Sequence, residues 1–186
     1  MAADGSDTAL LVMDVQERIV ERYGDEGLVE RIAAAAGTAR ERGILVVYVK
    51  VDFRPGYPEV SRRNKSFARL AGNGFAAGTA IHEGVAPQEG DVIVTKRRVS
   101  AFSGSDLELI LRARDIHRLV LTGIATSGVV LSTLRQAADL DYELVVLRDC
   151  CTDGDADVHE LLLGKVFPRQ ADVVDLGTWQ EQLASL

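Results

Sequence analysis

Short apolar runs alternate along this chain with longer segments of helical period. Six runs rich in β-branched residues are short enough to be strands, at 9–15, 44–51, 91–95, 119–123, 143–147 and 171–175. Helical patterns fill 25–42, 105–115, 127–140, 156–167 and 178–185. The run 44–51 is apolar on both faces, which is typical of a strand covered by helices on both sides. The pattern therefore predicts a mostly parallel α/β sandwich.

One long segment breaks this alternation. Residues 52–90 hold three of the four prolines, several glycines and a basic cluster at 62–65. We expect an irregular excursion here, within a single domain that spans residues 1–186. Long loops in compact domains are usually binding loops, lids or contacts between subunits, and a poorly ordered segment is the plainer alternative.

The charge and composition of the chain argue against nucleic acid and membranes as binding partners. The formal net charge is -7, so no general field attracts nucleic acid or anionic lipid. No apolar run approaches the roughly 20 residues that cross a bilayer, and the first residues lack the features of a secretory signal. The two cysteines, Cys150 and Cys151, are neighbours, and a bridge between neighbours would be badly strained. We expect a cytoplasmic protein with reduced thiols, no nucleic-acid partner and no membrane contact.

The candidate catalytic residues lie at the predicted carboxyl ends of the strands, where open α/β sheets bind their ligands. Asp14 follows the apolar run 9–13, and a carboxylate in that position needs a partner or a function. Lys96, at the end of the third strand, is its natural partner. An aspartate at a strand end is also a common helix cap, and a lysine there is often simply solvated, so the residues alone leave both readings open. The glycine-containing turn 123–128 lacks the spacing of a dinucleotide or phosphate loop.

Four motifs occur together and in order along the chain. They are LVMDVQ at 11–16, KRRVSAF at 96–102, LTGIAT at 121–126 running on to Ser132-Thr133, and DCC at 149–151 before VFP at 166–168. In this combination the chain resembles the isochorismatase-like, or cysteine hydrolase, superfamily from about residue 8 to 176. The resemblance implies a three-layer α/β/α sandwich with a six-stranded parallel sheet in the order 3-2-1-4-5-6. It also implies a homo-oligomer, a dimer or a tetramer.

The resemblance also assigns roles to residues. Members of this family typically hydrolyse small amides with an Asp, Lys and Cys triad, which places Asp14 as the base and Lys96 as the cation beside it. Backbone N–H groups of Ala125 and Val129 would stabilise the oxyanion. We expect the peptide bond between Ile124 and Ala125 to be cis, as its counterpart is in the family.

The nucleophile position departs from the family. The family's cysteine stands six residues after the glycine of the Gly-x-x-Thr motif, and six residues after Gly123 is Val129. Valine has no nucleophilic atom. Cys150 and Cys151 lie at the end of the predicted fifth strand and do not fit the role by position, so packing is the expected role for both.

No metal and no cofactor are expected, and the partner is a small-molecule substrate or ligand. Nicotinamidases of the family bind a metal with an Asp and two His after the second strand, whereas here Asp52 has no histidine nearby. The three histidines are scattered, at 82, 117 and 159. The expected substrate pocket contains Gln16 and Thr126 with aromatic walls, for which core packing is the alternative; the candidate walls are Phe53, Phe75 and Phe102.

Three interpretations of the missing thiol stay open. In the first, the protein is a hydrolase without a covalent intermediate, as in the isochorismate-cleaving members, and Asp14 transfers a proton while water attacks an enol ether, amide or carbamoyl bond. This chemistry needs burial of Asp14 to oppose the effect of Lys96 on its pKa. In the second, a hydroxyl of Ser127 or Ser132 is the nucleophile, although Ser127 is expected to cap a helix. In the third, the protein is catalytically degenerate and binds a small molecule or a protein partner.

Overall fold

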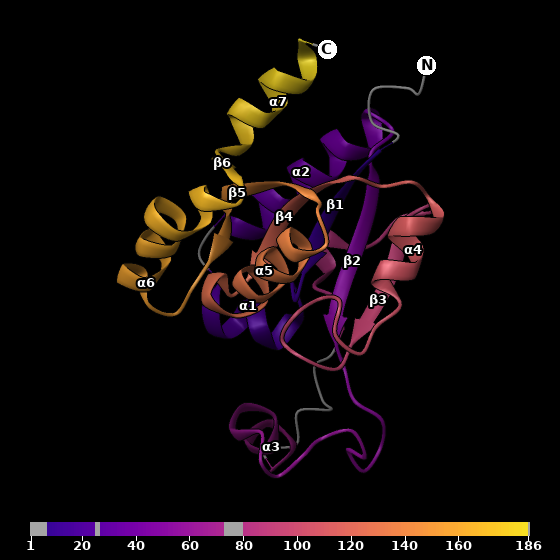
Figure 1. Ribbon diagram of the computed structural model, residues 1–186, viewed down its shortest axis with the longest axis vertical. Coiled ribbons are helices and arrows are strands. Elements are labelled where there is room, and N and C mark those ends of the chain that lie inside the picture. Colours follow the sequence, from indigo (N-terminus) through magenta and orange to yellow (C-terminus); the bar gives the residue numbers. More distant parts are fainter. Residues whose placement is uncertain (1–6, 25–26, 73–79, 186) are drawn as a thin grey trace.

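The computed structural model describes residues 7–24, 27–72 and 80–185, and within them the chain forms one six-stranded sheet (Figure 1). All neighbouring strands are parallel, and their order is β3-β2-β1-β4-β5-β6. The predicted parallel α/β fold and strand order are confirmed. The strands are β1 Thr8–Met13, β2 Leu45–Val51, β3 Val92–Lys96, β4 Arg118–Ile124, β5 Glu143–Thr152 and β6 Asp172–Val174.

Seven α-helices lie in the described part of the chain. They are α1 Glu17–Tyr23, α2 Leu28–Glu41, α3 Lys65–Gly72, α4 Leu107–Ala113, α5 Leu131–Asp139, α6 Ala156–Leu161 and α7 Leu176–Ala184. Short helical turns at Glu83–Val85, Thr126–Val130, Leu162–Val166 and Phe167–Arg169 complete the regular structure. Within the described ranges, no helix has both the length and the apolar character needed to cross a membrane.

The helices cover the sheet on both faces and create two apolar cores. One core lies on the α4 and α5 face and includes Leu11 and Leu134. The other lies on the α2 and α7 face and includes Leu10 and Trp179. Strand β1 runs through the middle of the sheet, so all six of its residues are buried. This position explains why its sequence is apolar without alternation.

Two helices lie where the sequence predicted none. Helix α1 directly follows the first strand, and α3 lies inside the segment that was expected to be irregular. Each has only seven or eight residues, which is about two turns and too short for a clear helical period. The helix expected at 25–42 corresponds to α2, which begins at Leu28; residues 25–26 are not among the residues that the structure describes.

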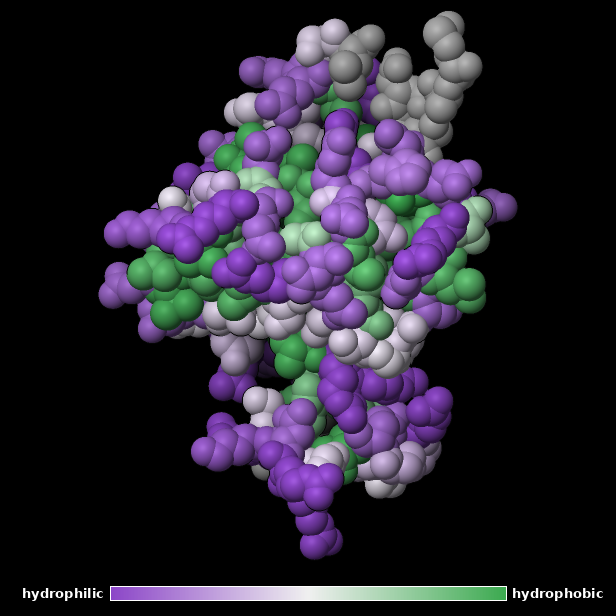
Figure 2. All heavy atoms as spheres, in the orientation of Figure 1, coloured by the Kyte–Doolittle hydropathy of each residue, from purple (hydrophilic) through white to green (hydrophobic). Residues whose placement is uncertain are grey.

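Residues 52–72, which we call the arm, project from the carboxyl ends of the strands (Figure 1). Figure 2 shows the arm as a separate, mostly hydrophilic lobe that is narrower than the sheet-containing body. Its centre is aromatic, because the ring of Phe53 packs edge-on against Phe67 with centroids 5.5 Å apart and lies 6.0 Å from the ring of Tyr57. Phe67 is only 4% exposed, so the lobe is packed rather than extended.

Association into a homo-oligomer stays a prediction. Large apolar side chains are exposed on separate elements, with Leu109 at 72% and both Ile93 and Leu161 at 52%. Single exposed apolar side chains of this kind are ordinary on a monomer, so the expectation rests on the projecting arm, a long segment of the type that often contacts other subunits. We expect light scattering at micromolar concentration to give two or four times the monomer mass of 20.1 kDa. A mass equal to the monomer would contradict this expectation.

Candidate active site

Asp14 and Lys96 form a buried ion pair at the carboxyl edge of the sheet. The Oδ2 atom of Asp14 lies 3.0 Å from Nζ of Lys96, and the two residues are 6% and 2% exposed. Strands β1 and β3 are separated by β2, or about 10 Å, so the lysine side chain must extend across the end of β2. The predicted contact between these two residues is confirmed.

The backbone after β1 places Asp14 at this edge. Its φ of 56° lies in the left-handed region, which aspartate tolerates better than most residues. The N–H of Asp14 donates to the carbonyl of Val49 at 2.8 Å, which ties this residue to the neighbouring strand β2. On the other side of the pair, Lys96 Nζ also donates to the carbonyl of Arg98 at 2.9 Å. Two acceptors therefore hold the ammonium in place.

Burial changes the proton affinity of Asp14. Desolvation raises the pKa of its carboxyl, and the charge and hydrogen bond of Lys96 oppose this rise without cancelling it. Within the described part of the chain, the Oδ1 atom is buried without a hydrogen-bond partner. A buried carboxylate oxygen without a donor is unfavourable when ionised. Asp14 is therefore suited to take up and release a proton closer to neutral pH than an exposed aspartate.

A close approach of β4 to β1 brings the segment that follows β4 close to the Asp14–Lys96 ion pair. Gly123 has a φ of 129°, and a Cβ at this position would overlap the backbone oxygen of Met13. Only glycine fits there. The next peptide bond, between Ile124 and Ala125, is cis as expected. The chain then passes through the helical turn Thr126–Val130 into α5.

A cavity of about 550 Å³ opens beside the ion pair. Its size is that of a pocket for a small metabolite. The structure brings four predicted site residues into its lining, Asp14, Lys96, Ala125 and Val129. The opposite walls come from α1 and from the arm, and include Arg18, Tyr23, Phe67 and Leu70.

The walls from α1 and α3 were not predicted. Both helices are short, so the sequence showed neither as an element. The spacing of Phe67 and Leu70, three residues apart in a polar segment, is the signal that could have indicated an apolar helix face.

The cavity offers no hydroxyl nucleophile on the turn that leads into α5. Val129 is 2% exposed and presents only methyl groups. Ser127 is exposed, Ser132 is half-buried, and neither lines the cavity. The expected cap by Ser127 is wrong, because no side chain from within this turn caps it. Instead, the carboxylate of Asp153 accepts a hydrogen bond from the N–H of Ser127 at 2.6 Å.

Two predicted polar pocket residues face other partners and do not line the cavity. The buried side-chain amide of Gln16 pairs with the backbone of Val51, accepting from its N–H at 2.8 Å and donating to its carbonyl at 3.1 Å. The hydroxyl of Thr126 contacts the carbonyl of Thr152 at 3.1 Å and Nδ1 of His159 at 2.8 Å. Both side chains form hydrogen bonds with backbone groups at strand ends, so they fix the backbone around the cavity and do not contact its interior.

The phenylalanines Phe53 and Phe102, which were predicted as aromatic walls, do not line the cavity either. Phe102 is 7% exposed and belongs to the core beside Tyr142, with ring centroids 6.1 Å apart. Phe53 packs behind Phe67, whose side chain lines the cavity in its place. Phe75 lies outside the described residues. The aromatic walls are thus formed by Tyr23 and Phe67, which the sequence pattern did not single out.

The two cysteines are free and buried within β5. Burial is the main cause that raises the pKa of both thiols, that of Cys151 to about 12. Neither therefore forms a thiolate at neutral pH, which agrees with a packing role. Across the described ranges, no group of three or more His, Cys, Asp or Glu side chains is placed to hold a metal ion.

Comparison with known proteins agrees with this fold. Residues 8–178 match the isochorismatase domain. The chain is 36% identical over 206 aligned positions to ureidoacrylate amidohydrolase RutB of Variovorax paradoxus, covering 96% of this chain and 78% of that protein. It is 31% identical over 163 positions to maleamate amidohydrolase of Pseudomonas putida, with 85% and 75% covered. The solved structure of an isochorismatase family protein from Burkholderia thailandensis superposes with a TM-score of 0.83 at 27% identity, covering 96% of both chains. The chain belongs to the isochorismatase family of hydrolases.

Proposed function

We propose that this protein hydrolyses a small amide or carbamoyl compound by proton transfer at Asp14, without a covalent intermediate. The observation that carries the proposal is the buried Asp14–Lys96 pair, which lines a cavity and leaves one carboxylate oxygen of Asp14 without a partner among the described residues. Two similar proteins are amidohydrolases, which favours a carbon–nitrogen bond over an enol ether.

The proposed reaction needs only water and the side chains of this site. The carboxylate of Asp14 removes a proton from a water molecule, whose oxygen attacks the substrate carbonyl carbon. The carbonyl electron pair moves to the oxygen, and backbone N–H groups of Ala125 and Val129 stabilise this oxyanion. The tetrahedral intermediate then collapses, the carbon–nitrogen bond breaks, and Asp14 returns its proton to the leaving nitrogen. Lys96 stabilises Asp14 in the ionised form that starts the cycle.

A second candidate is a binding protein that has lost turnover. Val129 favours it, because we infer that this valine occupies the position of the family's nucleophilic cysteine. Loss of the nucleophile alone typically removes most of the rate enhancement in enzymes that depend on one, leaving a residual acceleration of about 10³- to 10⁴-fold from binding and oxyanion contacts. A ligand would then occupy the same cavity without being cleaved.

A turnover screen separates the two candidates. The purified protein is incubated with ureido acids, half-amides of dicarboxylic acids and enol ethers, and release of ammonia or of the enol product is followed. The Asp14→Asn variant, purified in the same way, is the control for contaminating hydrolases. We expect saturable ammonia release from at least one ureido or amide compound. Saturable binding without release from any compound would support the binding protein instead.

Restoring a thiol at position 129 tests the geometry of the site. In Val129→Cys, the new thiol lies in the lining of the same cavity as the ammonium of Lys96. We expect the positive charge of Lys96 to lower the pKa of this thiol. We expect iodoacetamide to alkylate it much faster than Cys150 or Cys151, as measured by peptide mass spectrometry. The matched control is Val130→Cys, since Val130 is fully buried and does not line the cavity. Equal, slow alkylation at both positions would show that residue 129 is closed to small reagents.

A further inference from the structure

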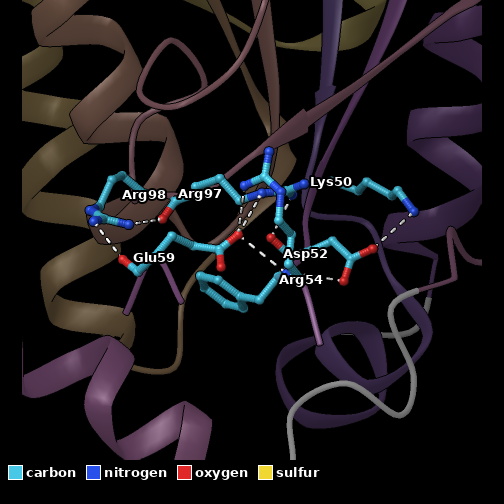
Figure 3. Close-up of polar contacts among 7 residues, drawn as sticks. Lys50, Asp52, Arg54, Glu59, Arg97 and Arg98 are labelled. Carbon is cyan, nitrogen blue, oxygen red and sulfur yellow. Dashed lines mark hydrogen bonds and ion pairs between the residues drawn. The ribbon is translucent and has the colours of Figure 1, made fainter. Parts of the chain in front are cut away.

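Glu59 ties the arm to the end of β3 (Figure 3). Its Oε1 atom lies 3.1 Å from Nε of Arg97 and 3.2 Å from Nη1 of Arg54, and it also accepts a hydrogen bond from the Arg54 N–H at 3.2 Å. Its backbone carbonyl accepts from Nη2 of Arg98 at 2.8 Å. Arg97 holds the start of the arm as well, because Nη1 donates to the carbonyl of Asp52 at 2.6 Å. One glutamate therefore joins two arginines at the end of β3 to the arm.

The contact between Glu59 and Arg97 is better shielded from solvent than an ordinary surface ion pair. The side chains of Glu59 and Arg97 are 13% and 22% exposed, so solvent screens them less than a fully exposed pair. Burial disfavours ionisation of Glu59, but backbone hydrogen bonds and the charges of Arg54 and Arg97 outweigh it, so its pKa lies below the ordinary value. The carboxyl is an anion at neutral pH and keeps its charge-assisted contacts.

Arg98 extends this connection to the ion pair. Its backbone carbonyl accepts the hydrogen bond from Nζ of Lys96, whose other partner is the carboxylate of Asp14. The position of the Arg98 side chain is set by carbonyl acceptors at Arg97 and Glu59. A shift of Arg98 therefore moves one of the two acceptors that hold the ammonium.

Arg98 also reaches the wall of the cavity. Its guanidinium carbon lies 5.9 Å from the ring centroid of Phe67, within range of a cation–π contact. Phe67 lies on α3 and lines the cavity opposite the sheet edge. The same arginine thus contacts the helix that forms the outer wall and the lysine at the inner wall.

We propose that Glu59 is a positioning residue, which through Arg97 and Arg98 holds α3 over the cavity and keeps the ammonium of Lys96 beside Asp14. The inference rests on the proposed function only in treating Asp14 and Lys96 as the reacting pair. Glu59 does not line the cavity, so it acts through its arginine partners rather than on a substrate.

Glu59→Gln tests this connection, because it keeps the size of the side chain and removes its charge. The arm carries exposed trypsin sites at Arg62, Arg63, Lys65 and Arg69. Cleavage of a transiently opened segment follows the population of its open form, so we expect trypsin to cut these sites about fivefold faster in the variant. We also expect the pKa of Asp14, measured by ¹³C NMR of its carboxyl carbon, to rise, because the charge of Lys96 lowers it in the parent.

Two further variants complete the test. Glu108→Gln removes the partner of Arg112 in an exposed ion pair of 2.7 Å on α4 and should change neither measurement. Arg98→Met removes the guanidinium that contacts the Glu59 carbonyl and the Phe67 ring, and leaves the backbone carbonyl that accepts from Lys96 without its side-chain anchor, so it should reproduce both effects of Glu59→Gln. If the Asp14 pKa or the cleavage rate is unchanged in folded Glu59→Gln and Arg98→Met, the proposal is overturned. Neither readout needs a substrate, so absence of turnover with both effects present would count against the proposed function alone.

Discussion

Replacing Asp14 by asparagine should lower kcat by about 10²- to 10⁴-fold, the range that general acid–base groups typically contribute. Asparagine has nearly the same shape and keeps an oxygen that can accept the hydrogen bond of Lys96, but it cannot remove a proton from water. The proposed role of Asp14 is proton transfer rather than substrate binding, so KM should change far less than kcat. Steady-state kinetics with the best substrate from the turnover screen measure both.

The matched control is Asp115→Asn. Asp115 has a similar left-handed backbone, with a φ of 52°, but it is exposed and lies outside the cavity. This variant should keep full activity. Residual turnover in Asp14→Asn equal to that of Asp115→Asn would exclude Asp14 as the proton-transfer group.

The pH dependence follows from the same residue. Asp14 must be ionised to act as a base, so activity falls as pH falls through its pKa. Burial raises that pKa, and the acid limb of kcat/KM should therefore lie at higher pH than the ordinary aspartate value of about 3.9. A profile that stays flat down to the ordinary value would contradict the raised pKa.

Replacing Lys96 by methionine should destabilise the fold by about 3–5 kcal/mol at neutral pH, the typical result of breaking a buried ion pair from one side. The methionine fills much of the volume of the lysine but leaves the carboxylate of Asp14 buried without a counter-charge. Urea unfolding at pH 7 measures the loss. The control is Lys50→Met, since the ion pair of Lys50 with Asp52 is longer, at 3.5 Å, and more exposed.

The loss in Lys96→Met should shrink in acid. Without Lys96, the pKa of Asp14 in the folded state rises further above its unfolded value. Folding then binds a proton, so stability is greatest at low pH and decreases as pH rises through the folded pKa. The double variant Asp14→Asn with Lys96→Met removes the uncompensated charge and should be more stable at pH 7 than Lys96→Met alone. Additive losses in the two single variants would show that the pair is not coupled.

The Asp14–Lys96 contact could be predicted from the sequence, and the walls of the cavity that come from α1 and the arm could not. In a parallel sheet the carboxyl ends of all strands meet at one edge, so two charged residues that end apolar strands are brought together by topology alone. Gln16 and Thr126 also lie at strand ends, yet their side chains turn to the backbone of Val51 and Thr152. The direction of a side chain after a strand depends on local turns and on which buried polar groups need a partner.

Periodicity along the chain is enough to predict the six parallel strands, because burial on both faces of a sheet leaves a continuous apolar run in each strand. The motifs were enough to indicate the family. The arm, its connection through Glu59 to Arg97 and Arg98, and the contribution of Phe67 to the cavity follow only from the tertiary structure. Glu59 and Arg98 are 39 residues apart, and a hydrogen bond between two irregular segments leaves no period in the sequence. Regular elements are encoded by repeated local preferences, whereas this site is completed by single long-range contacts that form only when the folded chain brings its segments together.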